Sequence, residues 1–118
     1  MSVSSISAGL IVRNKKILMF RNEDEDAWDV PSVRPEKGEI SAEAALRASE
    51  KFSQCECEVN RYKKKLQLQL GSGNNWNPYL VDLKGTPERG EWVSKDELKD
   101  RELVPHLESN KEKFVNKI

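Results

Sequence analysis

The sequence has few cysteines, a single histidine, no net charge and no long apolar run. Two cysteines and one histidine leave almost no material for a disulfide framework or a zinc site. Cys55 and Cys57 stand two positions apart, so in a strand they share one face and bridge poorly to each other. We expect both thiols to be reduced and packed, and we assign no chemistry to His106.

The charges of the chain balance, with 20 basic and 20 acidic side chains. Binding to nucleic acid or to an anionic membrane needs a summed positive field, which this composition does not supply. No segment approaches the ~20 apolar residues that span a bilayer, and residues 1–10 lack a signal-peptide pattern. We therefore expect a cytoplasmic protein without a membrane or nucleic-acid partner. Residues 61–65 read Arg-Tyr-Lys-Lys-Lys and are interpreted as a solvated strand face, with a small phosphate or RNA patch as the alternative.

The 118 residues contain no internal repeat and no Pro/Gly/Ser-rich linker, so we predict one domain over residues 1–118. Small and β-branched residues, period-2 alternation and turn residues predict the strands, and alanine-rich composition predicts a central helix. The predicted helices are a central one over about 41–53, with Ser41 as its N-cap, and a closing one at 105–118. The predicted strands are a hairpin (5–12 and 17–20) and segments at 56–62, 64–70, 78–83 and 91–93, with a turn at 71–75. A capping box is predicted from Ser94 to Glu97.

One constellation resembles a known family. Residues 28–31 read Trp-Asp-Val-Pro, residues 36–39 read Glu-Lys-Gly-Glu, and Arg47 stands eight positions after Glu39. This order and spacing resemble the Nudix box with its usual Trp-x-x-Pro flank, and residues 91–98 resemble the late Trp-x-x-x-x-Glu-Leu turn of the family. The resemblance implies an α/β (α+β) fold, a Nudix-like α/β/α sandwich with a mixed β-sheet between helices. It also implies hydrolysis of a nucleoside diphosphate linked to another moiety, with divalent metals held by box glutamates.

The box departs from the family at its metal ligands. In this register the three family glutamates fall on Ala48, Lys51 and Phe52, which offer no oxygen ligand to magnesium. A helix turns by roughly 100° per residue, so Glu43 and Glu50 face away from the stripe that these three positions form. We therefore expect no metal cofactor and a degenerate Nudix box in a non-catalytic protein.

An enzyme remains the alternative. A slow or atypical pyrophosphohydrolase would use Glu36 and Glu39, together with a late carboxylate such as Glu91 or Glu97. Only this alternative calls for Mg²⁺ or Mn²⁺. A subunit that only contacts another protein is the second alternative.

The leading hypothesis is a protein that binds a nucleotide-like small molecule or a protein partner, including a second copy of itself. We predict ligand contacts through Trp28, Arg21, Arg34 and Lys51, with phosphate charge met by Arg34 or Lys51. Trp28 is chosen through its position in the family pattern, whereas Trp76 is expected in a turn.

Arg47 has two interpretations. In the family the box arginine braces the loop, and Arg47 would do so with Glu39 or Glu36. Otherwise Arg47 forms a solvated ion-pair face with Glu43. Phe52 is assigned to the core rather than to ligand contact, because it lies on the helix face that meets the sheet.

Overall fold

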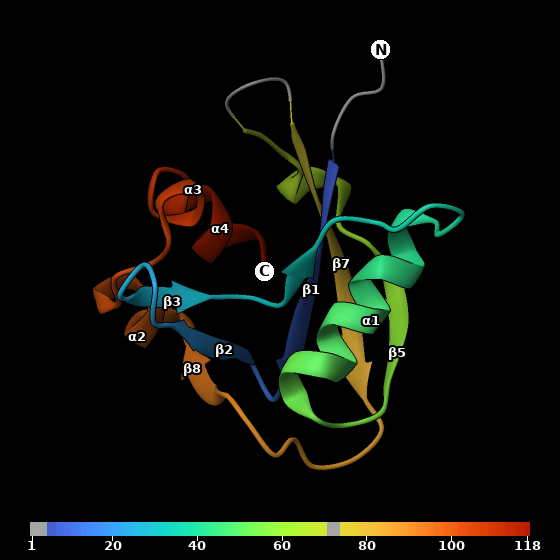
Figure 1. Ribbon diagram of the computed structural model, residues 1–118. Coiled ribbons are helices and arrows are strands. Elements are labelled where there is room, and N and C mark those ends of the chain that lie inside the picture. Colours follow the sequence, from blue (N-terminus) through green and yellow to red (C-terminus); the bar gives the residue numbers. More distant parts are fainter. Residues whose placement is uncertain (1–4, 71–73) are drawn as a thin grey trace.

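The computed structural model describes residues 5–70 and 74–118, which form one mixed sheet flanked by helices (Figure 1). The long strands run in the order β3-β2-β1-β7-β5, and β1 and β7 are parallel whereas the other neighbours are antiparallel. The strands are β1 (Ser5–Arg13), β2 (Lys16–Asn22), β3 (Ala27–Asp29), β4 (Ser32–Val33), β5 (Cys57–Tyr62), β6 (Leu68–Gln69), β7 (Asn75–Leu83) and β8 (Glu91–Ser94). The short strands β4, β6 and β8 pair with β1, β7 and β2.

Helices cover both faces of this sheet. The helix α1 (Ser41–Ser53) packs on β1, β5 and β7, and Figure 1 shows it in front of these strands. The opposite face is covered by α2 (Lys95–Asp100), α3 (Pro105–Glu108) and α4 (Lys111–Lys117). The predicted α/β/α sandwich with a mixed sheet is thereby confirmed.

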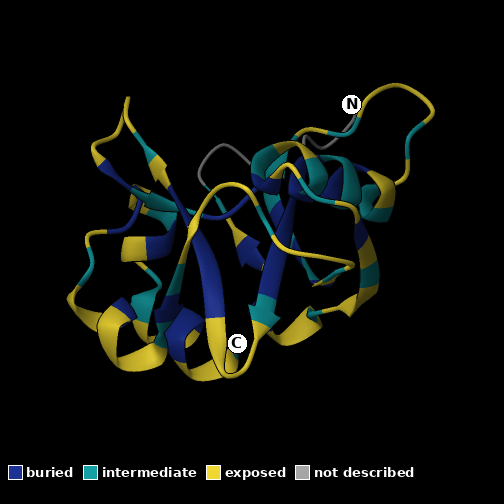
Figure 2. Cartoon of the chain, turned by 90° about the horizontal axis from the view of Figure 1, so that it is seen from below, coloured by how far each residue is buried: buried dark blue, intermediate teal, exposed yellow. Residues whose placement is uncertain are grey.

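The core lies in two layers, one on each face, because successive strand side chains alternate. Leu10, Trp76 and Phe114 are fully buried in the larger layer beneath α2 to α4. Ile11 and Val81 belong to the smaller layer beneath α1. Figure 2 shows the resulting pattern, with buried residues along the strands and exposed residues in the loops and outer helix faces.

The helix α1 spans the predicted residues, Ser41–Ser53, but its N-cap differs from the prediction. Ile40, not Ser41, is the N-cap, and its backbone N–H donates to Glu43 Oε1 at 3.1 Å. Ser41 is the first helical residue, and its hydroxyl lies 2.7 Å from the hydroxyl of Ser7 on β1. The predicted N-cap is therefore wrong, because the acid in the first turn meets the free backbone donor instead. The end at Ser53 is as predicted, with Gln54 in the left-handed conformation.

Two further predictions are wrong in detail. Residues 64–70 were expected to form one strand, but Lys64–Leu66 form the 3₁₀ turn η1 and only β6 follows. The turn forms because Leu66 is fully buried, which draws the chain out of the extended path. The closing helix is divided into α3 and α4. At the break the side-chain amide of Asn110 donates to the His106 carbonyl, which takes the place of a backbone N–H of a continuous helix.

The strand β7 is longer than predicted. It begins at Asn75, so Trp76 lies in the core of the sheet and not in a turn, while residues 71–73 lie outside the described residues. The predicted capping box is confirmed, because Glu97 N–H donates to Ser94 Oγ and Ser94 N–H donates to Glu97 Oε1, both at 3.2 Å. No helix in the described part of the chain has the length and apolar character needed to cross a membrane.

Candidate functional site

A cleft of about 540 Å³ opens where four segments of the chain meet. These are the end of β2, the middle of β3, the last turn of α1 and the loop that leads into β8. The residues that line it are Phe20, Arg21, Trp28, Lys51, Phe52, Arg89, Gly90 and Glu91. The sequence brings four separated segments together here, and three of the predicted ligand residues, Arg21, Trp28 and Lys51, are among them.

One wall of the cleft is aromatic. The rings of Phe20 and Phe52 meet edge to face, with centroids 5.6 Å apart and an interplanar angle of 81°. Phe52 packs against the core beneath α1, as predicted, and it also lines the cleft, which the sequence argument did not foresee. The box position that carries a glutamate in the family is therefore an apolar wall here.

Trp28 is held in place by two guanidinium groups. Arg101 lies over its ring at 4.8 Å and Arg21 at 5.9 Å. Each arginine is itself anchored by a carboxylate, Arg21 by Asp26 and Arg101 by Glu91. The half-buried indole is thus positioned both by these cation–π contacts and by packing against the larger core layer.

The cleft carries more positive than negative charge. Lys51, Arg21 and Arg89 line it, whereas Glu91 is its only acidic lining residue in the described chain, and that carboxylate is paired with Arg101. Within residues 5–70 and 74–118 neither Lys51 nor Arg89 forms an ion pair. Two exposed cations are therefore left for an anionic ligand.

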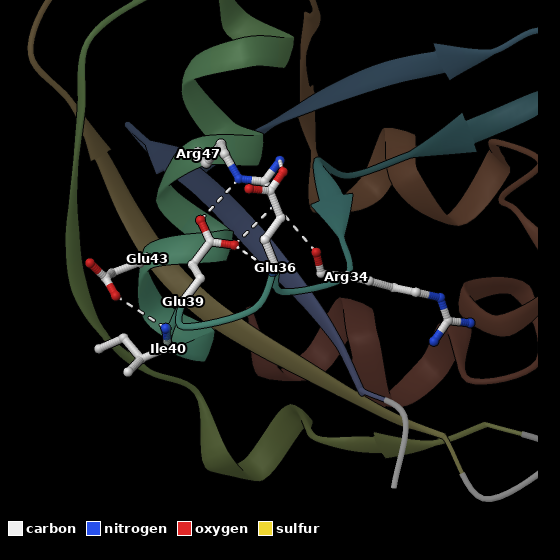
Figure 3. A network of polar contacts seen from close by, with 6 residues as sticks. All are labelled: Arg34, Glu36, Glu39, Ile40, Glu43 and Arg47. Atoms are coloured by element: carbon white, nitrogen blue, oxygen red, sulfur yellow. Dashed lines mark hydrogen bonds and ion pairs between the residues drawn. The ribbon is translucent and has the colours of Figure 1, made fainter. Parts of the chain in front are cut away.

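The loop before α1 is fastened by Arg47 (Figure 3). Its Nε and one terminal nitrogen donate to the two carboxylate oxygens of Glu39, each at 3.0 Å, and the guanidinium also donates to the Arg34 carbonyl at 3.3 Å. Glu36 lies 3.7 Å from the same guanidinium. The hydrogen bond from Arg47 is the main cause that lowers the pKa of Glu39. Of the two interpretations of Arg47, the geometry is that of a brace, since Glu43 bonds Ile40 instead.

The predicted ligand residue Arg34 is not brought to the cleft. Its backbone is part of the brace, and Figure 3 shows its side chain leading away from Glu36, Glu39 and Arg47. The structure therefore separates Arg34 from Arg21, Trp28 and Lys51.

Arg89 and Gly90 also line the cleft, although neither was predicted from the sequence. Gly90 has a φ of +96°, and a Cβ added there would lie 2.8 Å from side-chain atoms of Leu18 and Phe20. Glycine thus lets the loop before β8 lie directly on β2 and deliver Arg89 to the cleft. The one available signal was a glycine immediately before a predicted strand.

Comparison with solved structures decides the fold. The structure is similar to that of a UDP-X diphosphatase, with a TM-score of 0.78, 19% identity, and coverage of 97% of this chain but only 60% of the other. A NUDIX hydrolase from Nitrosomonas europaea gives a TM-score of 0.79 at 11% identity, with 98% and 72% coverage. The chain has the Nudix fold. An ADP-ribose pyrophosphatase from Streptococcus suis gives 0.69 at 16% identity, with 86% and 80% coverage.

Sequence comparison adds nothing to this result. No protein-family model and no curated protein matches the sequence. At the identities above, structural likeness establishes the Nudix fold alone, so any statement about ligand or chemistry depends on the residues of the cleft.

The segment that resembles a Nudix box does not offer the ligands that a divalent metal needs. Ala48 is fully buried and has no donor atom, Lys51 offers an ammonium, and Phe52 packs on Phe20. In the described part of the chain no three His, Cys, Asp or Glu side chains lie together as a metal site would require. Magnesium needs several oxygen ligands in near-octahedral geometry, and this donor set does not provide them.

The carboxylates of the alternative hypothesis are bonded to other groups of the protein. Both oxygens of Glu39 accept from Arg47, and one also accepts from the Glu36 backbone at 2.9 Å. Glu91 is paired with Arg101, and the Glu97 carboxylate accepts from the Ser94 N–H in the capping box of α2. Neither Glu36 nor Glu39 lines the cleft.

Proposed function

We propose that this Nudix-fold chain binds an anionic, nucleotide-like ligand in the cleft and does not carry out metal-dependent hydrolysis. The observation that carries the proposal is Lys51. It stands at a box position where the family places a metal-binding glutamate, it lines the cleft, and it has no ion pair in the described chain. An ammonium thus replaces a carboxylate at this position, which favours an anion over a cation there.

The size and composition of the cleft support a small organic anion. A volume of about 540 Å³ lies within the range of small-molecule pockets. The indole of Trp28 lines the cleft with Arg21 over its ring, while Lys51 and Arg89, which form no ion pair in the described part of the chain, offer charge-assisted hydrogen bonds to phosphate oxygens. Two structural neighbours are named for UDP-X and ADP-ribose compounds, which share a nucleoside diphosphate, and we propose that class for this chain.

The first experiment is a thermal-shift panel of UDP-sugars, ADP-ribose and dinucleotides with chelator present. A ligand at one hundred times its dissociation constant is expected to stabilise the folded protein by about 2.7 kcal/mol. Lys51→Glu is expected to remove the shift, because it reverses the charge that faces the phosphates. The matched control is Lys99→Glu, since Lys99 is also an exposed lysine in the last turn of a helix, and it should keep the shift.

Two results would contradict the proposal. A shift that persists in Lys51→Glu would place the ligand outside the cleft. The absence of any shift across the panel would favour the second alternative, a subunit that only contacts another protein.

A further inference from the structure

A second cavity, of about 320 Å³, lies away from the cleft and shares no lining residue with it. It is formed where the end of β5, the turn η1 and the last turn of α4 meet. Its lining residues are Arg61, Tyr62, Lys63, Lys64, Lys65 and Lys117. We call this cavity the lysine pocket.

The backbone builds the lysine pocket in a defined way. The pairing of β5 with β7 shifts register between Val59 and Arg61, which re-aims the end of the strand. The Lys63 N–H then donates to the Pro78 carbonyl at 2.9 Å, and the fully buried Leu66 anchors the turn. Three consecutive lysines are thus held on one tight, anchored turn. The sequence had predicted that they lie along a strand.

The lysine pocket is cationic without compensation. Five of its six lining residues are basic and none is acidic. In the described part of the chain none of the five forms an ion pair, whereas basic residues elsewhere, such as Arg47, Lys84 and Lys111, do. Burial and the neighbouring charges of Arg61, Lys65 and Lys95 lower the pKa of Lys63. Such mutual repulsion is relieved by a bound anion.

We propose that the lysine pocket is a second binding site, for a compact anion that carries two or more phosphate groups. Several cationic side chains that line one cavity can each donate to a different phosphate oxygen. An anion with two or more phosphate groups offers more acceptor oxygens to these donors than a single phosphate does. This site is independent of the cleft and of the function proposed for it.

The geometry favours a compact anion over single-stranded RNA. RNA binding of this kind needs an open aromatic face on which bases stack. Of the residues that line the pocket, Tyr62 alone is aromatic, so a run of successive bases would have no series of rings to stack on. Tyr62 is 37% exposed, but its ring already contacts Tyr79 with centroids 5.0 Å apart, and the hydroxyl donates to Asn77 Oδ1 at 3.3 Å. The balanced net charge of the chain also gives no long-range attraction for a polynucleotide.

The test is calorimetric titration with inorganic tripolyphosphate at low salt. One equivalent is expected to bind, and Lys64→Ala combined with Lys65→Ala should weaken it by about tenfold for each lysine removed, since hydrogen bonds to charged groups contribute ~1.5 kcal/mol or more. Both side chains are exposed, so the double variant should fold. The control is Lys84→Ala combined with Lys99→Ala, which makes the same change in net charge at two other exposed lysines and should bind normally.

The remaining outcomes overturn the proposal. Equal weakening in the control would show a general charge effect, and loss of binding in Lys51→Ala would place tripolyphosphate in the cleft. A parallel titration with a short oligouridine is expected to show weaker binding, and tighter binding that is lost in the Lys64/Lys65 double variant would assign the pocket to RNA. No binding of tripolyphosphate would refute the site.

Discussion

Replacing Gly9 with alanine is expected to destabilise the protein by about 2 kcal/mol. Gly9 lies in the middle of β1, where α1 crosses the sheet, and an added Cβ would lie 1.9 Å from Ser49 Oγ. The Ser49 hydroxyl cannot simply rotate away, because it is fully buried and donates to the Ala45 carbonyl at 2.8 Å. The measurement is equilibrium unfolding in urea.

The same contact gives a rescue. Removing the hydroxyl in Ser49→Ala is expected to restore much of the lost stability in the Gly9→Ala background, although the Ser49 Cβ, at 3.3 Å, keeps the site tight. Gly85→Ala is the matched control, since an added Cβ there meets only the Cys55 sulfur at 3.5 Å, and it should be near neutral. Additive effects of the Gly9 and Ser49 substitutions would show that the helix does not approach β1 as described.

Replacing Asp29 with asparagine is expected to stabilise the protein at neutral pH by up to about 3 kcal/mol. Burial raises the pKa of the Asp29 carboxyl from 3.8 to about 6. Hydrogen bonds from Val30 and Asn22 lower this pKa, but they are outweighed by burial, and the negative charge of Glu25 raises the pKa further. The folded state therefore binds a proton more tightly than the unfolded state. Asparagine carries no charge to bury and still offers Oδ1 to the Val30 N–H, which lies 2.7 Å from the carboxylate.

The pH dependence of this difference is fixed by the direction of the shift. Below the unfolded pKa of 3.8 aspartate is neutral in both states, so the two proteins should have similar stability. As pH rises through the folded pKa of about 6 the wild type loses stability relative to the variant, and the difference then stays constant. Asp100→Asn, at an exposed position, is the control and should show no such trend. A constant difference at all pH values would indicate a packing effect instead.

The fold could be predicted because its markers are local and ordered. The Trp-x-x-Pro segment from Trp28, the Gly-Glu opening at residues 38–39 and the box arginine Arg47 each have a fixed place in the Nudix pattern, and the structure has the Nudix fold. The failures occurred where tertiary contacts override local pattern. Leu66 is drawn into the core and breaks an alternating segment, and Trp76 belongs to β7 although turn residues precede it.

The candidate site could be predicted only in part, for a similar reason. Trp28 and Lys51 were found because they occupy family positions, and Arg21 lies opposite Trp28 on the neighbouring strand. Arg89 reaches the cleft through a loop whose path depends on the close contact of Gly90 with Phe20, which no spacing rule encodes. Nor could helix geometry alone show that Phe52 both packs against the core and lines the cleft.

Calorimetric titration of the wild-type protein with ADP-ribose, first with chelator and then with excess magnesium, tests the central claim most directly. We predict the same affinity in both titrations and intact ADP-ribose in the cell afterwards, because in the proposed binding mode Lys51, which lines the cleft, meets the phosphates in place of a metal. Binding that requires magnesium, with ADP-ribose consumed and the turnover lost in Glu36→Gln or Glu39→Gln, would contradict the account and establish an atypical hydrolase.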